Sequence, residues 1–323
     1  MSQQNLIDRI ADDADGAGLH LAEATGRKPK GKRRRSLMTR RVPWWFVVPG
    51  LAIYLFAVLI PSGQGLAFSF TDWNGIRTSL EWVGFENYIK AFSDKAVQDS
   101  LLNTVFFALA IMILQNAIGL LLALGVNRVI KSRYVLRVVL FAPAVLTPVV
   151  TSYVWKFLYA PTGPINSTLE AVGLGAFQQD WLGNPDLARW SIVMVVVWQN
   201  AGYSMVIFLA GLQGVPDEIY EASALDGAGP FRTFFSITRP LLAPAITINL
   251  MLSIIGGLKM FDQVQVLTNG GPGTATATMS TTIVKVGSLY GEYSYSLAMA
   301  VLLTIGVAIV SGLQYRLLAR QGK

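Results

Sequence analysis

Six stretches of this chain are apolar over about twenty residues, and this feature limits the fold more than any other. A helix needs about 20 residues to cross a hydrocarbon core of ~30 Å. Within lipid the backbone must satisfy its own hydrogen bonds, which favours helices over irregular structure. Only 14% of the residues are charged, against roughly 25% in soluble domains. We therefore predict an all-α integral membrane protein with six transmembrane helices, at residues 44–62, 101–126, 138–158, 189–211, 241–261 and 294–316.

The Lys and Arg residues gather in alternate connections between these stretches. Ten precede the first stretch, four lie between the second and third, two between the fourth and fifth, and three at the C-terminal end. The connections on the opposite side hold five in all. Because such residues collect on the cytoplasmic side of a bilayer, we expect both termini and the connection at about 212–240 to be cytoplasmic.

The N-terminal residues 1–42 are polar and carry the basic run RKPKGKRRR at 27–35. No hydrophobic period there is long enough to bury a core, so we predict a disordered basic cytoplasmic tail. The six-helix transmembrane domain would then occupy 43–323. A basic run of this kind can bind RNA or anionic lipid. Next to a first span, a role in fixing orientation is favoured, and no nucleic-acid partner is expected.

Residue types that carry catalytic and metal chemistry are scarce. The chain has no cysteine, and its single histidine, His20, lies in the polar tail. We therefore expect no metal site, no catalytic residues and no cofactor bound by this chain. The stretch TNGGPGT at 268–274 lacks the Gly-Lys-Ser/Thr ending of a phosphate loop. A membrane-embedded transferase, the less favoured alternative, would need an acidic or histidine cluster, and the acids of the outer connections form no recognisable pair.

A polar stretch at 216–244 separates two apolar ones and is far longer than a turn requires. Its first proline and the two acids that follow suit a first helical turn. Apolar residues then recur at every third position from Ile219 to Leu225, on one face of a short amphipathic helix. Gly227 and Gly229 can end this helix in a left-handed conformation. A helix outside the bilayer with an apolar face needs a surface to cover it, so we predict a docking element.

Polar side chains at mid-membrane depth mark the fourth stretch. Gln199, Asn200 and Tyr203 lie within about one helical turn. An aromatic ring with amide donors and acceptors is what a polyhydroxylated ligand needs. In the fifth stretch, Gly256 and Gly257 thin the helix and allow a ligand to approach the backbone. These residues predict a saccharide site, and hydrogen bonding between helices is the alternative without a ligand.

Two further polar pairs are expected to act structurally. Gln115 and Asn116 in the second stretch are expected to hydrogen-bond between helices, because polar groups at that depth avoid lipid. Lys259 and Asp262, three residues apart at the end of the fifth stretch, are expected to pair at the outer boundary.

The docking element also carries a resemblance to a known family. Glu221-Ala222-Ser223, Asp226-Gly227-Ala228, Ile237 and Pro240 are similar to the EAA signature of permease subunits of binding-protein-dependent ABC importers. The sequence EASALDGAGPF at 221–231 resembles the corresponding segment of the larger permease subunit of maltose-type transporters. The likeness runs from about residue 43 to the C-terminus. It implies a type I ABC importer permease fold, in which this loop is the coupling helix that sits on a cytoplasmic ATPase. The coupling residues it implies are Glu221, Ala222, Ser223, Asp226, Gly227, Ala228 and Arg232.

The same resemblance implies a pocket and an activity. Tyr203, Ser253, Gly256, Gly257 and Met260 match pocket positions of the maltose permease, and they join Gln199 and Asn200 as the expected substrate-binding set. Gly257 and Met260 stand where that permease has asparagines, so a different sugar is implied. The implied activity is transport of a mono- or oligosaccharide by alternating access, as the transmembrane subunit of an ATP-driven importer.

The resemblance also implies that the chain is a multi-pass protein of the bacterial cytoplasmic membrane, and it implies several partners. They are a second homologous permease, two ATPase subunits that hold ATP and Mg²⁺, and an extracytoplasmic solute-binding protein. Glycerol phosphate or another polar solute is the alternative substrate, although phosphate would favour Arg or Lys at membrane depth, where the fourth and fifth stretches offer only Lys259. A channel or secondary transporter would show charges inside several spans or a repeat with broken helices, and the sequence shows neither.

Overall fold

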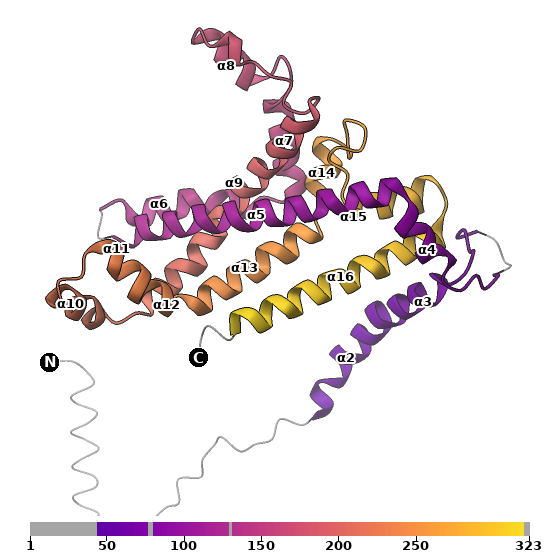
Figure 1. Ribbon diagram of the computed structural model, residues 1–323, viewed down its shortest axis with the longest axis horizontal. Helices are drawn as coiled ribbons and strands as arrows, with labels where there is room; N and C mark the ends of the chain where they lie inside the picture. The colour runs from indigo at the N-terminus through magenta and orange to yellow at the C-terminus, as the bar shows by residue number, and fades with distance from the viewer. Residues whose placement is uncertain (1–43, 77–79, 129–130, 320–323) are drawn as a thin grey trace, which may run out of the picture. The chain divides into compact units, whose positions relative to one another are not determined.

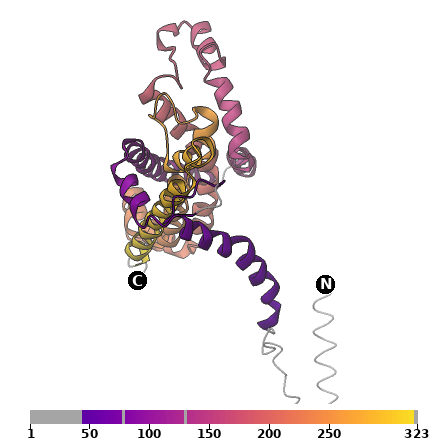
Figure 2. The same ribbon diagram turned by 90° about the vertical axis from the view of Figure 1, so that its right-hand side faces the viewer.

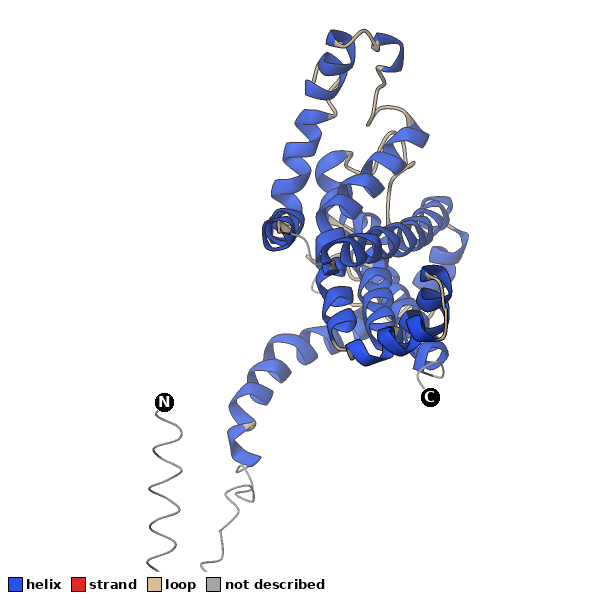
Figure 3. Ribbon diagram, turned by 90° about the vertical axis from the view of Figure 1, so that its left-hand side faces the viewer, coloured by secondary structure: helices blue, strands red, loops and turns tan. Residues whose placement is uncertain are grey.

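The structure is a computed structural model and describes residues 44–76, 80–128 and 131–319. Helices and loops make up these ranges, apart from one isolated bridge between Thr71 and Trp82 (Figure 3). The predicted tail at 1–42 lies outside the described residues and stays a prediction. Contacts divide the chain into two units, Met1–Ala57 and Val58–Lys323, and the two are described separately.

The described part of the first unit is helical. A short 3-10 helix, Trp44–Phe46, precedes helix α2, Val48–Tyr54, and the side chains of residues 45–57 are exposed. The second unit continues from the π-helical segment Leu55–Leu59 into α3, Ile60–Phe68. By length and hydropathy, Val48–Phe68 is suited to cross a membrane.

The described helices confirm the predicted all-α membrane fold. Besides Val48–Phe68, three more are long and apolar enough to cross a bilayer: α5 (Lys95–Asn127), α9 (Pro185–Gln213) and α16 (Tyr293–Ala319). Two bent pairs raise the number to six if each pair counts as one span. The first pair is α6 (Arg133–Phe141) with the 3-10 turn Ala142–Val145, followed by α7 (Pro148–Leu158); the second is Pro230–Leu241 followed by α13 (Ala243–Leu258).

The third apolar stretch is therefore not the single helix that its length predicts. The chain bends by 96° between Val145 and Pro148. Leu146 and Thr147 are both extended there, with ψ of 145° and 147°. Proline disfavours the helical conformation of the residue before it, and Thr147 precedes Pro148. Thr147 instead caps α7, where its side chain accepts a hydrogen bond from the Val150 N–H. Figures 1 and 2 both show α7 leading away from α6.

The core lies where α5 packs along α9 and α13. Glycines bring these helices close together. A Cβ on Gly119 of α5 would lie 2.6 Å from the Cβ of Ser204 on α9, and one on Gly257 of α13 would lie 2.6 Å from the Cα of Ala108 on α5. Such contacts leave no room for a side chain, so these glycines set the spacing of the three helices.

Shorter elements connect the long ones. The docking stretch forms α10 (Asp217–Leu225), α11 (Pro230–Thr233), a π-helical turn (Phe234–Thr238) and α12 (Arg239–Leu241). Beyond α13, the chain forms α14 (Asp262–Leu267), α15 (Met279–Val284) and a second π-helical turn (Lys285–Leu289). The remaining short helices are α4 (Glu86–Ser93), α8 (Pro164–Ala171) and the 3-10 turn Gly175–Phe177. Figure 1 shows α10, α11 and α12 at one end of α13 and α14 at the other.

Candidate functional site

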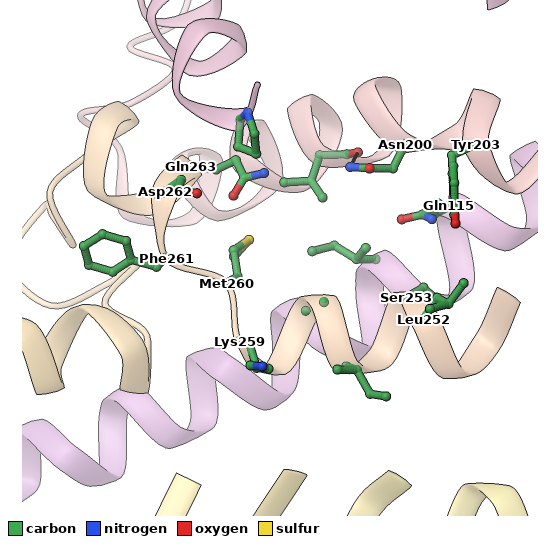
Figure 4. A pocket seen from close by; sticks show the side chains of 16 residues that line it. Gln115, Asn200, Tyr203, Leu252, Ser253, Lys259, Met260, Phe261, Asp262 and Gln263 are labelled. Atoms are coloured by element: carbon green, nitrogen blue, oxygen red, sulfur yellow. Dashed lines mark hydrogen bonds between the residues drawn. The ribbon is translucent and has the colours of Figure 1, made fainter. Parts of the chain in front are cut away.

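A cavity of about 520 Å³ opens among α5, α9, α13 and the connection from α13 to α14. Figure 4 shows its lining side chains, with Tyr203 and Asn200 on one wall and Ser253 and Leu252 on the facing helix. Pro148, the first residue of α7, also lines it, so the break in the third stretch borders the cavity. The volume is in the range of small-molecule sites.

Six of the seven predicted substrate-binding residues line this cavity: Asn200, Tyr203, Ser253, Gly256, Gly257 and Met260. The seventh, Gln199, does not. It is buried, and its Nε2 donates a hydrogen bond to the carbonyl oxygen of Leu146 at 2.8 Å. Successive residues of a helix are turned by about 100° from each other, so Gln199 faces the broken third stretch while its neighbour Asn200 faces the cavity. Gln199 satisfies the carbonyl that the break leaves without a helical partner.

Several polar groups of the cavity have no hydrogen-bond partner within the described ranges. These groups are the Asn200 side-chain oxygen, the Tyr203 hydroxyl, the Asp262 carboxylate and the Gln263 amide. Tyr203 is 45% exposed, which leaves a ring face uncovered. A ligand with several hydroxyls matches this mixture of aromatic rings, Tyr203 and Phe261, and several planar hydrogen-bonding groups.

The predicted pair of Lys259 and Asp262 does not form, which corrects the sequence interpretation. Helix α13 ends at Leu258 and α14 begins at Asp262, so the helical spacing on which that prediction depended does not apply. Both residues line the cavity, and neither makes an ion pair in the part of the chain that the structure describes. Sequence reasoning missed them as lining residues, together with Gln263, because hydropathy does not show where a helix stops.

The polar residues of α5 do connect helices, as predicted. Gln115 donates from Nε2 to the Ser204 hydroxyl of α9 at 2.9 Å, and Asn116 donates from Nδ2 to the Ser253 hydroxyl of α13 at 2.8 Å. Gln115 also lines the cavity. Ser253, which lines the cavity, in turn donates to the Asn249 carbonyl oxygen at 2.8 Å, so its hydroxyl is held in place.

The docking element forms a capped helix as predicted. Gly227 has φ +71°, and the two bonds that close the end of α10 run from its N–H to the Ala224 carbonyl at 3.1 Å and from the Ala228 N–H to the Ser223 carbonyl at 3.0 Å. This pattern is a Schellman cap. Gly229, by contrast, has φ −69° and precedes α11, so its predicted left-handed role is wrong.

The predicted coupling residues divide into an exposed and a buried group. Glu221, Ala222, Asp226, Gly227 and Arg232 are exposed, and Ala228 is partly buried. Ser223 is buried, and its hydroxyl lies 3.0 Å from that of Thr233, which ties α10 to α11.

Large apolar side chains are exposed beside this signature. Leu225 is 89% and Phe231 81% exposed. Large exposed apolar side chains beside a capped helix suit contact with another surface. Within the described ranges, no three histidine or acidic residues gather closely enough to hold a metal ion.

Comparison with known proteins identifies the class of this architecture. The fold is that of a type I ABC importer permease, and a chain of a bacterial ABC transporter involved in the import of the acidic polysaccharide alginate shares it: the match covers 87% of this chain and 96% of that chain with a TM-score of 0.76 at 20% identity. Residues 115–323 match the family model described as the inner membrane component of binding-protein-dependent transport systems. The chain belongs to this family.

Two of the similar proteins show how much of the chain the likeness covers. The diacetylchitobiose uptake system permease protein of Streptomyces coelicolor is 33% identical over 314 residues, which span 91% of this chain and 89% of that protein. The sn-glycerol-3-phosphate transport system permease protein of Yersinia pestis is 30% identical over 282 residues, which span 87% and 95%. Both proteins are similar to this chain, and the substrate in each name is that protein's own substrate.

Proposed function

We propose that this chain is the transmembrane subunit of an ATP-driven importer that moves a mono- or oligosaccharide across the bacterial cytoplasmic membrane. The observation that carries the proposal is the cavity between α9 and α13, where the exposed ring of Tyr203 lies with the unpaired polar groups of Asn200, Asp262 and Gln263. Rings and planar hydrogen-bonding groups suit sugars, which offer C–H faces and hydroxyl edges. The name of the diacetylchitobiose relative supports the same substrate class.

The energy for transport would come from partner subunits. The exposed apolar residues Leu225 and Phe231, beside the acids of α10 and Arg232, form a surface suited to the cleft of an ATPase. ATP and Mg²⁺ would be held there, on two ATPase subunits, and not on this chain. A second homologous permease would complete the cavity, and an extracytoplasmic solute-binding protein would deliver the sugar. The distribution of Lys and Arg supports cytoplasmic positions for the docking loop and both termini.

Alternating access would follow from the short connection between the docking stretch and the cavity. Helix α13 begins directly after α12 and carries Ser253, Gly256 and Gly257 to the cavity. Movement of α10 and α11 with the ATPase would shift this helix and change which side of the membrane the cavity faces.

A second candidate substrate is glycerol 3-phosphate, which the Yersinia pestis relative is named for. Lys259 is the one cation among the residues that line the described cavity, and the Asp262 carboxylate lines it as well. A phosphate group would gain from several converging cations, so the neutral saccharide is favoured.

The substrate proposal can be tested with Tyr203→Ala in the complete transporter reconstituted in liposomes. We expect the KM for the transported sugar to rise about two- to tenfold, because a ring contact contributes about 0.5–1.5 kcal/mol. The affinity of the solute-binding protein for the sugar should not change. Diacetylchitobiose, maltose and glycerol 3-phosphate serve as probes.

The matched control is Tyr153→Ala, since Tyr153 is 62% exposed on α7 and does not line the cavity. Equal effects of the two substitutions would contradict the cavity as the transport site. Import of glycerol 3-phosphate in preference to both sugars would replace the saccharide proposal with the second candidate.

A further inference from the structure

Four cations gather where α5 ends and α6 begins. We name this surface the basic corner and define it by Arg128, Lys131, Arg133, Arg137 and the ring of Tyr134. No Asp or Glu occurs anywhere from residue 100 to 169, so the chain offers no nearby acid in sequence. The ion pairs in the described part of the chain, Lys90 with Glu292 and Lys95 with Asp99, lie elsewhere.

One member of the basic corner is a structural anchor. Arg137 donates from Nη2 to the Val126 carbonyl oxygen at 3.1 Å, one of the carbonyls that the end of α5 leaves without a helical partner. Its guanidinium also lies 5.7 Å from the centre of the Tyr134 ring. The hydrogen bond ties α6 to the end of α5.

The other cations are available to a ligand. Arg128 and Lys131 are exposed, with no hydrogen-bond or ion-pair partner among the described residues. Among the described residues, the polar partner of Arg133 is the neutral Tyr134, with the Arg133 Nη2 2.9 Å from the phenolic oxygen and the guanidinium 4.8 Å from the ring centre. No acidic side chain of the described residues therefore neutralises their positive charge.

An apolar surface lies directly beside these charges. Val135, Val138 and Val139 of α6 are 65%, 70% and 59% exposed. Cations followed along a helix by uncovered aliphatic side chains, with a tyrosine at the boundary, are typical of a segment at the interface of a bilayer. A free phosphate ion would leave the valines uncovered, whereas the acyl chains of a phospholipid would cover them.

We propose that the basic corner binds the headgroup of an anionic phospholipid, whose acyl chains lie along the valines of α6. Charge complementarity selects the headgroup, since four cations without an acid attract a phosphate-bearing anion and gain little from a zwitterion. The site is separate from the sugar cavity and does not depend on which solute is transported.

The test uses the complete transporter in nanodiscs of phosphatidylcholine, with and without phosphatidylglycerol, and native mass spectrometry to count the lipids retained. The double variant Lys131→Gln, Arg133→Gln removes two cations. Each cation near an anionic surface contributes about a fivefold preference, so the variant should lose about 30-fold of the preference for phosphatidylglycerol. The matched control, Lys131→Arg with Arg133→Lys, keeps both charges and should keep the preference.

A second measurement on the unmodified protein covers the case in which the double variant does not fold. Raising the salt concentration should weaken retention of phosphatidylglycerol but not of phosphatidylcholine. Equal retention of the two lipids by the unmodified protein overturns the proposal. So does a double variant that keeps its preference for phosphatidylglycerol but loses an ATPase subunit, because the basic corner would then be a protein-docking surface.

Discussion

Replacing Gly227 with alanine tests whether the cap of α10 positions the docking loop. Gly227 has φ +71°, and a Cβ placed on it meets no atom within 4 Å. The substitution therefore adds no clash and changes only the backbone preference. Gly229, two residues later, also has open space around its Cβ position but has φ −69°. The two glycines therefore share open surroundings and differ in the sign of φ.

The expected size of the effect follows from that difference. A left-handed conformation costs an L-residue roughly 1–2 kcal/mol. At Gly229 the gain from restricting the unfolded chain, about 0.4–1 kcal/mol, offsets the poorer preference of alanine for a helix N-cap, so Gly229→Ala should be close to neutral. Gly227→Ala should then open the cap about 5- to 30-fold more often than Gly229→Ala does.

Hydrogen exchange measures this opening directly. The reporter is the Ala228 N–H, which is bonded to the Ser223 carbonyl at 3.0 Å only while the cap is closed. We expect its exchange to accelerate about 5- to 30-fold in Gly227→Ala, while exchange in α13 stays unchanged. Gly227→Asn should fall between alanine and glycine, since asparagine tolerates the left-handed region better than other side chains. In the assembled transporter, ATPase binding should weaken in the same order while the solute-binding protein keeps its affinity for sugar.

Identical exchange of the Ala228 amide in Gly227→Ala and Gly229→Ala would refute the reasoning, because it would show that the left-handed backbone does not limit the cap. Faster exchange with unchanged ATPase binding would leave the cap intact as a structural feature and contradict its role in docking.

Two further substitutions test how the broken third stretch is held. A Cβ on Gly202 of α9 would lie 2.1 Å from the Leu140 carbonyl oxygen of α6, so Gly202→Ala should destabilise the protein by about 1–3 kcal/mol. The melting temperature of the solubilised protein measures this, with Gly256→Ala, where no atom lies within 4 Å, as the control that makes the same replacement inside a helix without a clash. Gln199→Leu removes the donor to the Leu146 carbonyl and should cost about 1–3 kcal/mol, seen as faster hydrogen exchange at the break between α6 and α7. Equal melting temperatures for the two alanine variants, or unchanged exchange at the break, would contradict these assignments.

Local sequence patterns predicted the membrane class and the capped docking helix because each depends on residues close together in the chain. Hydropathy over twenty residues located the apolar stretches, and the glycine after Asp226 located the end of α10. The break in the third stretch was missed, although Pro148 and the residue before it favour one, because a hydropathy count ignores backbone hydrogen bonds. Its partner Gln199 was assigned to the substrate site because periodicity relates residues on one helix and does not show which face meets which neighbour.

Helix α13 explains how a docking loop and a cavity can act together in this chain. Its first turn follows Leu242, a fully buried residue that packs against Gly211 of α9. Eleven residues after Leu242, Ser253 lines the cavity, a distance of about 16 Å at 1.5 Å per residue. Between these points Asn249 donates to the Ser204 carbonyl of α9 at 3.2 Å, and a later residue, Gly257, lies directly against α5. Because α13 is bonded to both neighbours along one face, it cannot slide without changing the cavity wall. We therefore expect a displacement applied at α10 and α11 to reach the residues proposed to hold the sugar through α12 and the 71° bend that precedes α13.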